Sequence, residues 1–305
     1  EQSLLSDGGE RFGDLVEDYL DFKRVEQRKS AHTISNARCV LRIVSDLLGN
    51  PLLEDLQEDR MRDWVKKMLH AERGGLSVAT VRTYVAITKA YFSYCVDRRK
   101  FRVNPLKGIR LPVAKTSRRQ KYCTPMERDV LLAAVEREAG VDLAKVFYFG
   151  FLAGMRPGEI LAMERNWLFF SRDGRSGSIT VQETEHWRPK NKESRVIPMN
   201  WRLLCFLKRV PLGEGYVVAP DHSLWKDPPK KRFFFEKTFV RFCARHIDRM
   251  RVSPYVMRHS FATHLAMGGA SPMEVASLLG DDLQVVLDHY IGFFPAQDHT
   301  VNKMV

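Results

Sequence analysis

The residues of this chain that could do chemistry gather in the stretch 253–291, where Arg258, His259 and Tyr290 stand among short capped segments. The sequence offers no metal-ligand constellation, no glycine-rich phosphate loop and no acidic cluster of the kind that two-metal nucleases use. His259 and His264, for example, are five residues apart, which places them on different faces of a helix. An enzyme built on such residues would have to work through protein side chains.

Attack of a tyrosine hydroxyl on a phosphodiester is the reaction that these residue types suit, and it has four requirements. It needs the nucleophile, positive donors around the non-bridging oxygens, a proton donor for the leaving 5′ oxygen and a proton acceptor for the phenol. Arginine suits the second requirement because its planar guanidinium binds two phosphate oxygens and stays protonated. Two arginines can neutralise the pentacoordinate state without a metal ion. Lysine suits the third requirement because its pKa can fall near other cations.

Three short helices are predicted to position these groups. The first opens at a serine–proline pair, which is typical of a helix N-terminus, and closes at the glycines 268–269. The second opens at the capping box 271–274 and closes at Gly280. Asp281 or Asp282 caps the third. This arrangement would bring an arginine and a tyrosine together from distant points of the sequence.

The motif Arg-His-Ser-Phe-Ala-Thr-His-Leu at 258–265, the triplet Leu-Leu-Gly at 278–280 and a tyrosine ten residues after that glycine resemble the C-terminal box of the tyrosine recombinases, the phage-integrase and Xer-type family. The resemblance covers most of residues 120–295 and, more loosely, the N-terminal part of the chain. The combined pattern is highly specific, whereas the first motif alone would fit an ordinary capped helix.

The resemblance implies a role for each matched position. Arg156, in Ala-Gly-Met-Arg-Pro-Gly-Glu-Ile, matches the first catalytic arginine, with a structural salt bridge to Glu159 as the alternative. Glu159 matches a supporting acid that orients the start of its helix. Arg258 matches the second arginine. Tyr290 matches the nucleophile, with a buried packing aromatic as the alternative.

The family also carries a lysine on a β-hairpin, and Lys190 matches it. The spacing from Lys190 to Arg195 and to 196–198 is similar to the family's spacing before its second strand. Lys192 competes for this role and is otherwise a candidate for DNA contact.

Two positions depart from the family pattern. Three residues before the second arginine the family usually has histidine, and this chain has Tyr255; after Leu-Leu-Gly it usually has histidine or tryptophan, and this chain has Asp281. A phenol with a pKa of ~10 is a poor base at neutral pH. A carboxylate repels a phosphate unless it is protonated or paired with the second arginine or the hairpin lysine. His259 and His289 are nearby replacements, although His259 is expected to keep the family's structural role, and we expect a slow or conditional enzyme.

Composition agrees with a nucleic-acid partner. The 49 basic residues exceed the 37 acidic ones, and the net charge of +12 suits a polyanion, although a generic basic surface would give the same balance. The five cysteines are scattered and show no CxxC spacing, which argues against a disulfide framework or zinc site and fits a reducing cytoplasm. No apolar run approaches the ~18 residues of a membrane helix, and no secretory signal is visible.

The first part of the chain carries four apolar stripes at helical spacing. They predict a small helical domain over 1–112, which resembles the core-binding domain of the same family. Residues 113–122 are basic and poor in apolar side chains, so we expect an interdomain linker. Its candidates for phosphate contact are Arg118, Arg119 and Lys121, and the alternative is a solvated tether.

The remaining residues, 123–305, are expected to form the catalytic domain. Alternation at 178–182 and 194–199 predicts two strands, while the other periodic segments predict helices. The predicted fold is therefore mainly α with a small antiparallel β-sheet at one side. By resemblance, the final segment 293–305 would be exchanged between neighbouring subunits.

Together, the resemblance implies a site-specific DNA recombinase, such as the integrase of a mobile element. Tyr290 would form a 3′-phosphotyrosyl bond, and strands would be exchanged without a metal ion, ATP or another cofactor. The implied partners are double-stranded recombination sites and three further copies of the chain in a homotetramer. A catalytically impaired DNA-binding protein of the same fold stays open because of Tyr255 and Asp281. A type IB topoisomerase-like enzyme also stays open, although the helical N-terminal domain and short length favour the recombinase.

Overall fold

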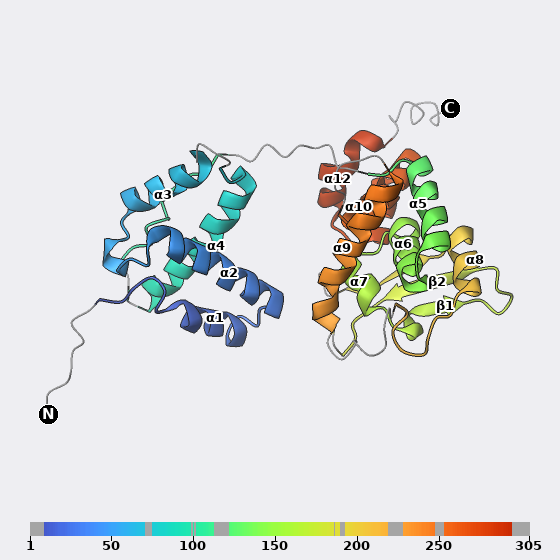
Figure 1. Ribbon diagram of the computed structural model, residues 1–305, viewed down its shortest axis with the longest axis horizontal. Helices are drawn as coiled ribbons and strands as arrows, with labels where there is room; N and C mark the ends of the chain where they lie inside the picture. The colour runs from blue at the N-terminus through green and yellow to red at the C-terminus, as the bar shows by residue number, and fades with distance from the viewer. Residues whose placement is uncertain are drawn as a thin grey trace, which may run out of the picture. The chain divides into compact units, whose positions relative to one another are not determined.

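The computed structural model describes residues 9–70, 75–98, 100, 102–112, 122–185, 187–189, 193–218, 228–247 and 253–294, with side chains from 236 onward in the range that begins at 228. The chain divides into two compact units, Glu1–Thr116 and Ser117–Val305, drawn in Figure 1. All of the predicted linker except Tyr122 lies outside the described residues. No helix in the described ranges is long and apolar enough to cross a membrane.

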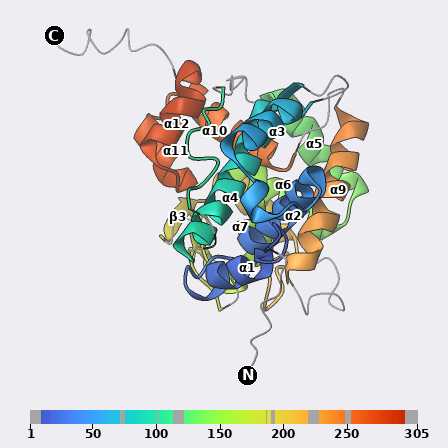
Figure 2. The same cartoon turned by 90° about the vertical axis from the view of Figure 1, so that its left-hand side faces the viewer.

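The first unit packs amphipathic helices around an aromatic core, as its apolar stripes predict. Ser30 caps the second helix by accepting a hydrogen bond from the Thr33 amide at 3.2 Å, and Ser77 caps the fourth helix through the Thr80 amide in the same way. The helices, labelled in Figure 2, are α1 (Val16–Val25), α2 (Ala31–Leu48), α3 (Glu58–His70) and α4 (Val78–Asp97), with the short 3-10 helix η1 (Leu53–Asp55).

The second unit is mostly helical with one small sheet, so the predicted fold class is confirmed. Its described elements are α5 (Pro125–Glu138), α6 (Val141–Ala153), α7 (Pro157–Ala162), η2 (Arg165–Trp167), β1 (Leu168–Phe170), β2 (Gly177–Val181), β3 (Arg195–Pro198), α8 (Trp201–Arg209), α9 (Pro228–His246), α10 (Tyr255–Met267), α11 (Pro272–Leu279), α12 (Leu283–Tyr290) and η4 (Ile291–Phe293). The strands pair antiparallel in the order β1-β2-β3, with Ile179 opposite both Leu168 and Ile197. Strand β1 was not predicted, because three residues are too few to show an alternating pattern.

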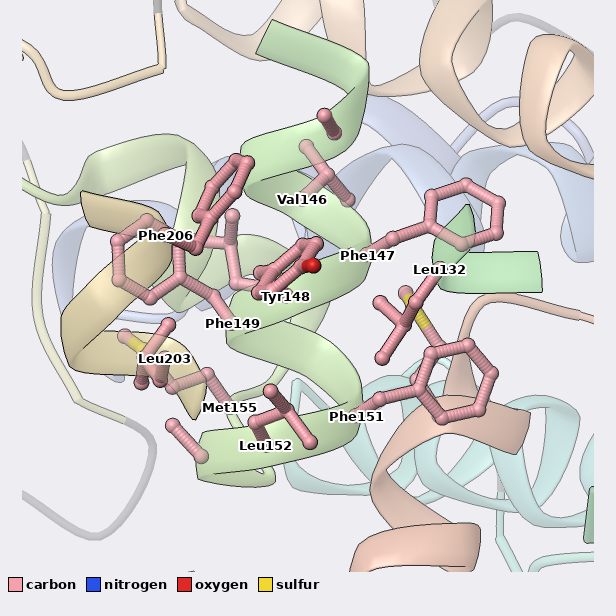
Figure 3. Packing of buried hydrophobic residues seen from close by; sticks show 14 of the residues in the cluster. Leu132, Val146, Phe147, Tyr148, Phe149, Phe151, Leu152, Met155, Leu203 and Phe206 are labelled. Carbon is pink, nitrogen blue, oxygen red and sulfur yellow. The ribbon is translucent and has the colours of Figure 1, made fainter. Parts of the chain in front are cut away.

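Helix α6 lies at the centre of the second unit. It is buried on all sides from Ala144 to Ala153, and Figure 3 shows its side chains packed against residues of α5 and α8. Tyr148 stacks on Phe206 of α8 with ring centroids 3.7 Å apart. Gly150 faces α10, where an added Cβ would lie within 2.9 Å of three Met257 atoms. The missing side chain thus allows α10 to approach α6 closely, and this contact sets the position of the next residue, Arg258.

The three predicted C-terminal helices are present as α10, α11 and α12, and the capping box at 271–274 is formed. Two predicted caps are wrong in detail. The Ser253 side chain does not cap α10, because Pro254 is already in the helical region and the helix begins at Tyr255. Asp282 precedes α12 without a side-chain capping bond.

Candidate active site

Arg258 is anchored by carbonyl oxygens at the ends of two helices. Its Nη1 donates to the Gly154 carbonyl at 2.9 Å, where α6 ends, and its Nη2 donates to the Leu279 carbonyl at 2.8 Å, where α11 ends. Such carbonyls lack partners within their own helices and carry the negative end of the helix dipole. Arg258 is only 4% exposed, so the direction of its side chain is fixed by the fold.

Glu159 holds the other predicted arginine. Its carboxylate accepts from the Arg156 amide at 2.8 Å and from Arg156 Nη1 at 2.8 Å. It also accepts from Arg195 Nη1 at 3.0 Å and Nη2 at 2.6 Å. Burial would raise the pKa of Glu159, but the hydrogen bonds and charges of Arg195 and Arg156 outweigh burial and hold the pKa below its ordinary value. Arg156 therefore does form the salt bridge that the sequence offered as an alternative, with its Nη2 still directed elsewhere.

Arg156 Nη2 contacts Asp281, one of the two residues that depart from the family pattern. Asp281 Oδ1 accepts from Arg156 Nη2, and its Oδ2 accepts from Arg258 Nη2 at 2.6 Å. Burial would raise the pKa of Asp281, but the opposing effects of Arg258 and, next, Arg156 are larger and hold the pKa below its ordinary value. The group is therefore ionised at neutral pH. The pairing with Arg258 was one of the conditions expected from the sequence, and the simultaneous pairing with Arg156 was not.

A pocket of about 240 Å³ opens beside these groups. Its lining includes Arg156, Arg195 and Asp281, together with Pro189 and Glu193. The lining combines charged and apolar side chains, and its two arginines are groups that can bind an anion.

Five predicted residues lie outside the described residues. They are the hairpin lysine Lys190, its competitor Lys192 and the linker residues Arg118, Arg119 and Lys121.

Tyr290 ends α12 and is only 3% exposed. Its ring packs with Ala262, Val275 and Val286, and its hydroxyl lies 2.7 Å from His259 Nδ1. Burial raises the pKa of Tyr290 to about 12, with Arg258 acting against this rise and the Asp281 carboxylate adding to it. The tyrosine is thus both a buried aromatic, as the alternative reading had it, and a hydrogen-bonded phenol.

His259 is neutral in this setting. Burial and then the charge of Arg258 lower its pKa to about 4. His289, the other replacement considered from the sequence, is exposed, and its ring centroid lies 6.3 Å from that of Tyr290. His259 thus contacts the candidate nucleophile directly, and its expected structural role stays a prediction.

Tyr255 is not brought into this set of contacts. It is the first residue of α10 and 39% exposed, and its hydroxyl has no hydrogen bond within the described part of the chain.

Arg195 is the site residue that sequence reasoning missed. In addition to its two bonds to Glu159, its Nε donates to the Leu278 carbonyl at 3.0 Å. A Cβ added at Gly280 would lie 2.8 Å from Arg195 Cδ, so this glycine leaves the space that the side chain crosses. The alternation of the strand could have identified it. Arg195 and the buried Ile197 are two residues apart on β3, so their side chains lie on the same, inward face.

No cluster of three or more His, Cys, Asp or Glu side chains that could hold a metal ion occurs among the described residues. All five cysteines are free thiols.

The phage integrase family matches residues 121–292, which is more than half of the chain and includes the whole site. The chain belongs to the phage integrase family. Its relatives include tyrosine recombinase XerC of Haemophilus ducreyi, 25% identical over 279 residues that cover 86% of this chain and 84% of the relative. Tyrosine recombinase XerD of Rickettsia bellii is 20% identical over 291 residues, which cover 88% of this chain and 90% of the relative.

Solved structures of this family share the fold. The Tn1549 transposon integrase in complex with transposon right end DNA aligns with a TM-score of 0.68 at 18% identity and covers 95% of this chain and 98% of its own. A lambda integrase dimer bound to a COC′ core site aligns with a TM-score of 0.69 at 15% identity and covers 89% and 95%. The chain is thus a tyrosine-type site-specific recombinase, as predicted, and neither the topoisomerase-like enzyme nor the non-catalytic protein is favoured.

Proposed function

We propose that this recombinase cleaves and rejoins DNA through Tyr290, with Arg156 and Arg258 binding the scissile phosphate. The observation that carries the proposal is the convergence of both guanidinium groups on one anionic group, the Asp281 carboxylate. One oxygen of this anion accepts from Arg156 and the other from Arg258, which is the arrangement that two non-bridging oxygens of a phosphodiester need. Tyr290 is within electrostatic range of Arg258 and Asp281.

The bond changes in the proposed reaction balance without a cofactor. Tyr290 Oη gives its proton to a base as it attacks phosphorus, the Oη–P bond forms, and the bond from phosphorus to the 5′ oxygen breaks. Lys190 gives the leaving oxygen its proton. This role is supported by Pro189 and Glu193, the described residues on either side of 190–192, because both line the pocket. The free 5′ hydroxyl of a partner strand then reverses the step, so the energy of the phosphodiester is kept in the protein–DNA bond.

The same proposal extends to domains and assembly. Residues 1–112 would bind the DNA core site, 113–122 would lie along the phosphates, and 123–305 would carry out catalysis. Exchange between two duplexes uses four active sites, so we propose a homotetramer on DNA in which residues 293–305 pass between neighbours. A lambda integrase tetramer bound to a Holliday junction is among the structures of this fold and supports this assembly. The proposed setting is a mobile element acting in the cytoplasm.

Tyr290→Phe tests the nucleophile. The variant should bind a nicked suicide substrate as the parent does, and it should form no covalent adduct, because it lacks the attacking oxygen. Denaturing gel analysis of the protein–DNA adduct measures this directly. Tyr216→Phe, which changes another tyrosine of the same unit, should form the adduct normally. Adduct formation by Tyr290→Phe would show that another residue attacks.

Salt dependence tests the linker. For a protein that neutralises many phosphates, affinity should fall by roughly 10³-fold or more between about 50 and 200 mM salt. Replacing Arg118, Arg119 and Lys121 together by glutamine should flatten this dependence. A charge-matched control replaces three exposed arginines elsewhere in the second unit, Arg137, Arg175 and Arg209. Equal slopes for the linker variant and the parent would rule out linker contact with DNA.

A further inference from the structure

The Tyr290 hydroxyl has one side-chain hydrogen-bond partner within the described residues, and that partner is His259. Nδ1 of the imidazole lies 2.7 Å from Oη, a normal distance for such a bond. The two residues belong to different helices, α10 and α12, so the contact depends on the packing of the C-terminal helices.

Helix geometry explains why the imidazole faces α12. His259 and Ala262 are three residues apart on α10 and therefore share a face. Ala262 packs in the same apolar cluster as the Tyr290 ring. Arg258, one residue earlier, points instead to the carbonyls of Gly154 and Leu279. One helix thus directs an arginine toward the anion site and an imidazole toward the phenol.

The two positions that depart from the family pattern do not supply a proton acceptor in this structure. Both carboxylate oxygens of Asp281 accept from arginines, and its pKa lies below its ordinary value. Tyr255 is exposed and has no hydrogen bond in the described part of the chain. His259 remains, with a ring nitrogen already at the reacting atom.

We propose that His259 is a catalytic residue that accepts the Tyr290 proton through Nδ1 as the phenol attacks phosphorus. The inference rests on the proposed role of Tyr290. In the step, the Oη–P bond forms, the Oη–H proton passes to Nδ1, and the imidazole becomes an imidazolium with both nitrogens protonated. The 5′ oxygen leaves with a proton from a separate donor, and the imidazolium returns its proton to Oη when the strand is rejoined.

The charges around the pair indicate when the proton moves. Burial, Arg258 and His289 lower the pKa of His259 to about 4, while Asp281 acts in the opposite direction. The pKa of Tyr290 is raised to about 12, so the proton stays on the phenol before attack. As the bond to phosphorus forms, Oη becomes strongly acidic and a neutral imidazole is a sufficient acceptor. The negative phosphate also favours the imidazolium.

His259→Asn tests this role, because the amide oxygen can accept the tyrosine hydrogen bond near the Nδ1 position but cannot hold a proton. Single-turnover cleavage should be roughly 10² to 10⁴-fold slower than in the parent, the usual contribution of acid–base catalysis, with DNA affinity unchanged. His259→Gln, which moves the oxygen away from that position, should be at least as slow and provides a second variant if Asn disturbs folding.

A substrate with a bridging 5′ sulfur separates the two proton transfers. A thiol has a pKa of about 8.5 and leaves without a proton donor. The sulfur substrate should therefore restore cleavage by Lys190→Ala. On the same substrate, His259→Asn should still cleave more slowly than the parent. A structural role for His259 would slow binding or unfold the protein instead of giving this pattern.

Three results would overturn the inference, and each can be distinguished from the others. If Tyr290→Phe forms no adduct while both His259 variants cleave within about threefold of the parent, a margin of less than 1 kcal/mol, His259 is not the acceptor and Tyr290 keeps its role. If Tyr290→Phe still forms an adduct, the nucleophile assignment fails and the inference fails with it. Rescue of His259→Asn by the sulfur substrate would place His259 on the leaving-group side.

Discussion

The two halves of the candidate site are held in place by different forces. The arginine–carboxylate cluster, which consists of Arg156, Glu159, Arg195, Arg258 and Asp281, is tied together by ion pairs and helix-end carbonyls. The tyrosine–histidine pair, Tyr290 and His259, consists of neutral groups held by apolar packing and one hydrogen bond.

This difference follows from what each half has to do. The three arginines and two carboxylates of the cluster leave one positive charge in excess. The proposed phosphate site needs this excess, and the carboxylates hold the arginines that supply it in fixed positions. The proposed nucleophile, Tyr290, has to keep its proton until the substrate arrives, and burial among apolar side chains favours this by raising its pKa to about 12. Ion pairs thus hold the arginines in place, whereas apolar packing keeps the tyrosine protonated.

The largest effect is expected for Glu159→Gln, which would break the cluster at its most buried point. Arg195 would lose its carboxylate partner and Arg156 would lose one of its two, at a glutamate that is only 1% exposed, so the free energy of unfolding should fall by about 3–5 kcal/mol. Urea denaturation measures this loss. Cleavage should fall as well, because Arg156 would lose its support.

Glu274→Gln is the matched control. Glu274 also stands at the third position of a proline-started helix and accepts from a backbone amide, Ser271 N at 2.7 Å, but it is exposed and has no arginine partner among the residues that the structure describes. Its loss of stability should be much smaller. Equal losses for Glu159→Gln and Glu274→Gln would mean that helix capping, and not the arginine network, is what Glu159 contributes.

A smaller, pH-dependent effect is expected for Asp281→Asn. The pKa of Asp281 is lower in the folded protein than in the unfolded chain, so its stabilising contribution is present above the unfolded value of ~3.9 and is lost as pH falls through the folded value. Asp281→Asn should therefore be less stable than the parent near neutral pH, with the difference shrinking below about pH 4.

Urea midpoints across pH for the parent and Asp281→Asn check this direction. Asp282→Asn changes the neighbouring carboxylate, which is exposed and makes no capping bond, and it should follow the parent at every pH. A difference between Asp281→Asn and the parent that grows toward acid would contradict the ion-pair explanation.

The smallest effect on stability is expected for Tyr255→Phe, because Tyr255 belongs to neither half of the site. Its hydroxyl has no partner within the described residues, so unfolding should change by no more than about 0.5 kcal/mol. If the hydroxyl donates to a phosphate oxygen when DNA is bound, cleavage should be roughly 10- to 150-fold slower. Tyr255→His should keep or raise the rate and add a pH dependence near ~6.5. Cleavage by Tyr255→Phe at the parent rate would assign Tyr255 to packing.

Local signals were enough to predict the helices of the site. The capping box at 271–274 and the glycine at the end of α11 are short-range patterns, and both are formed as expected. The same reasoning failed at Ser253, because Pro254 takes the N-cap position and the helix begins at Tyr255. The short strand β1 has too few residues to carry a periodic signal.

The contacts of the cluster were much harder to predict. Arg156 and Asp281 are 125 residues apart, and their pairing depends on how α6, α10 and α11 pack together. The sequence could identify Asp281 as unusual, but only the fold shows that its carboxylate lies between two arginines. Arg195 was overlooked for the same reason, since its partner Glu159 is 36 residues away on another element. The predicted roles of Lys190 and the linker residues stay predictions.

The position of Asp281 has a consequence for which anions this enzyme can bind. Because the carboxylate is part of the same chain, it competes for Arg156 and Arg258 at a high and constant effective concentration. A small free anion, with no other contact to hold it, competes poorly against such a tethered ligand. A phosphate of bound DNA is also held near the arginines, by the other contacts along the duplex. Its effective concentration is therefore high as well, and it can compete with the Asp281 carboxylate. The arginines would therefore bind free inorganic phosphate weakly and would bind a phosphate that belongs to a correctly placed duplex.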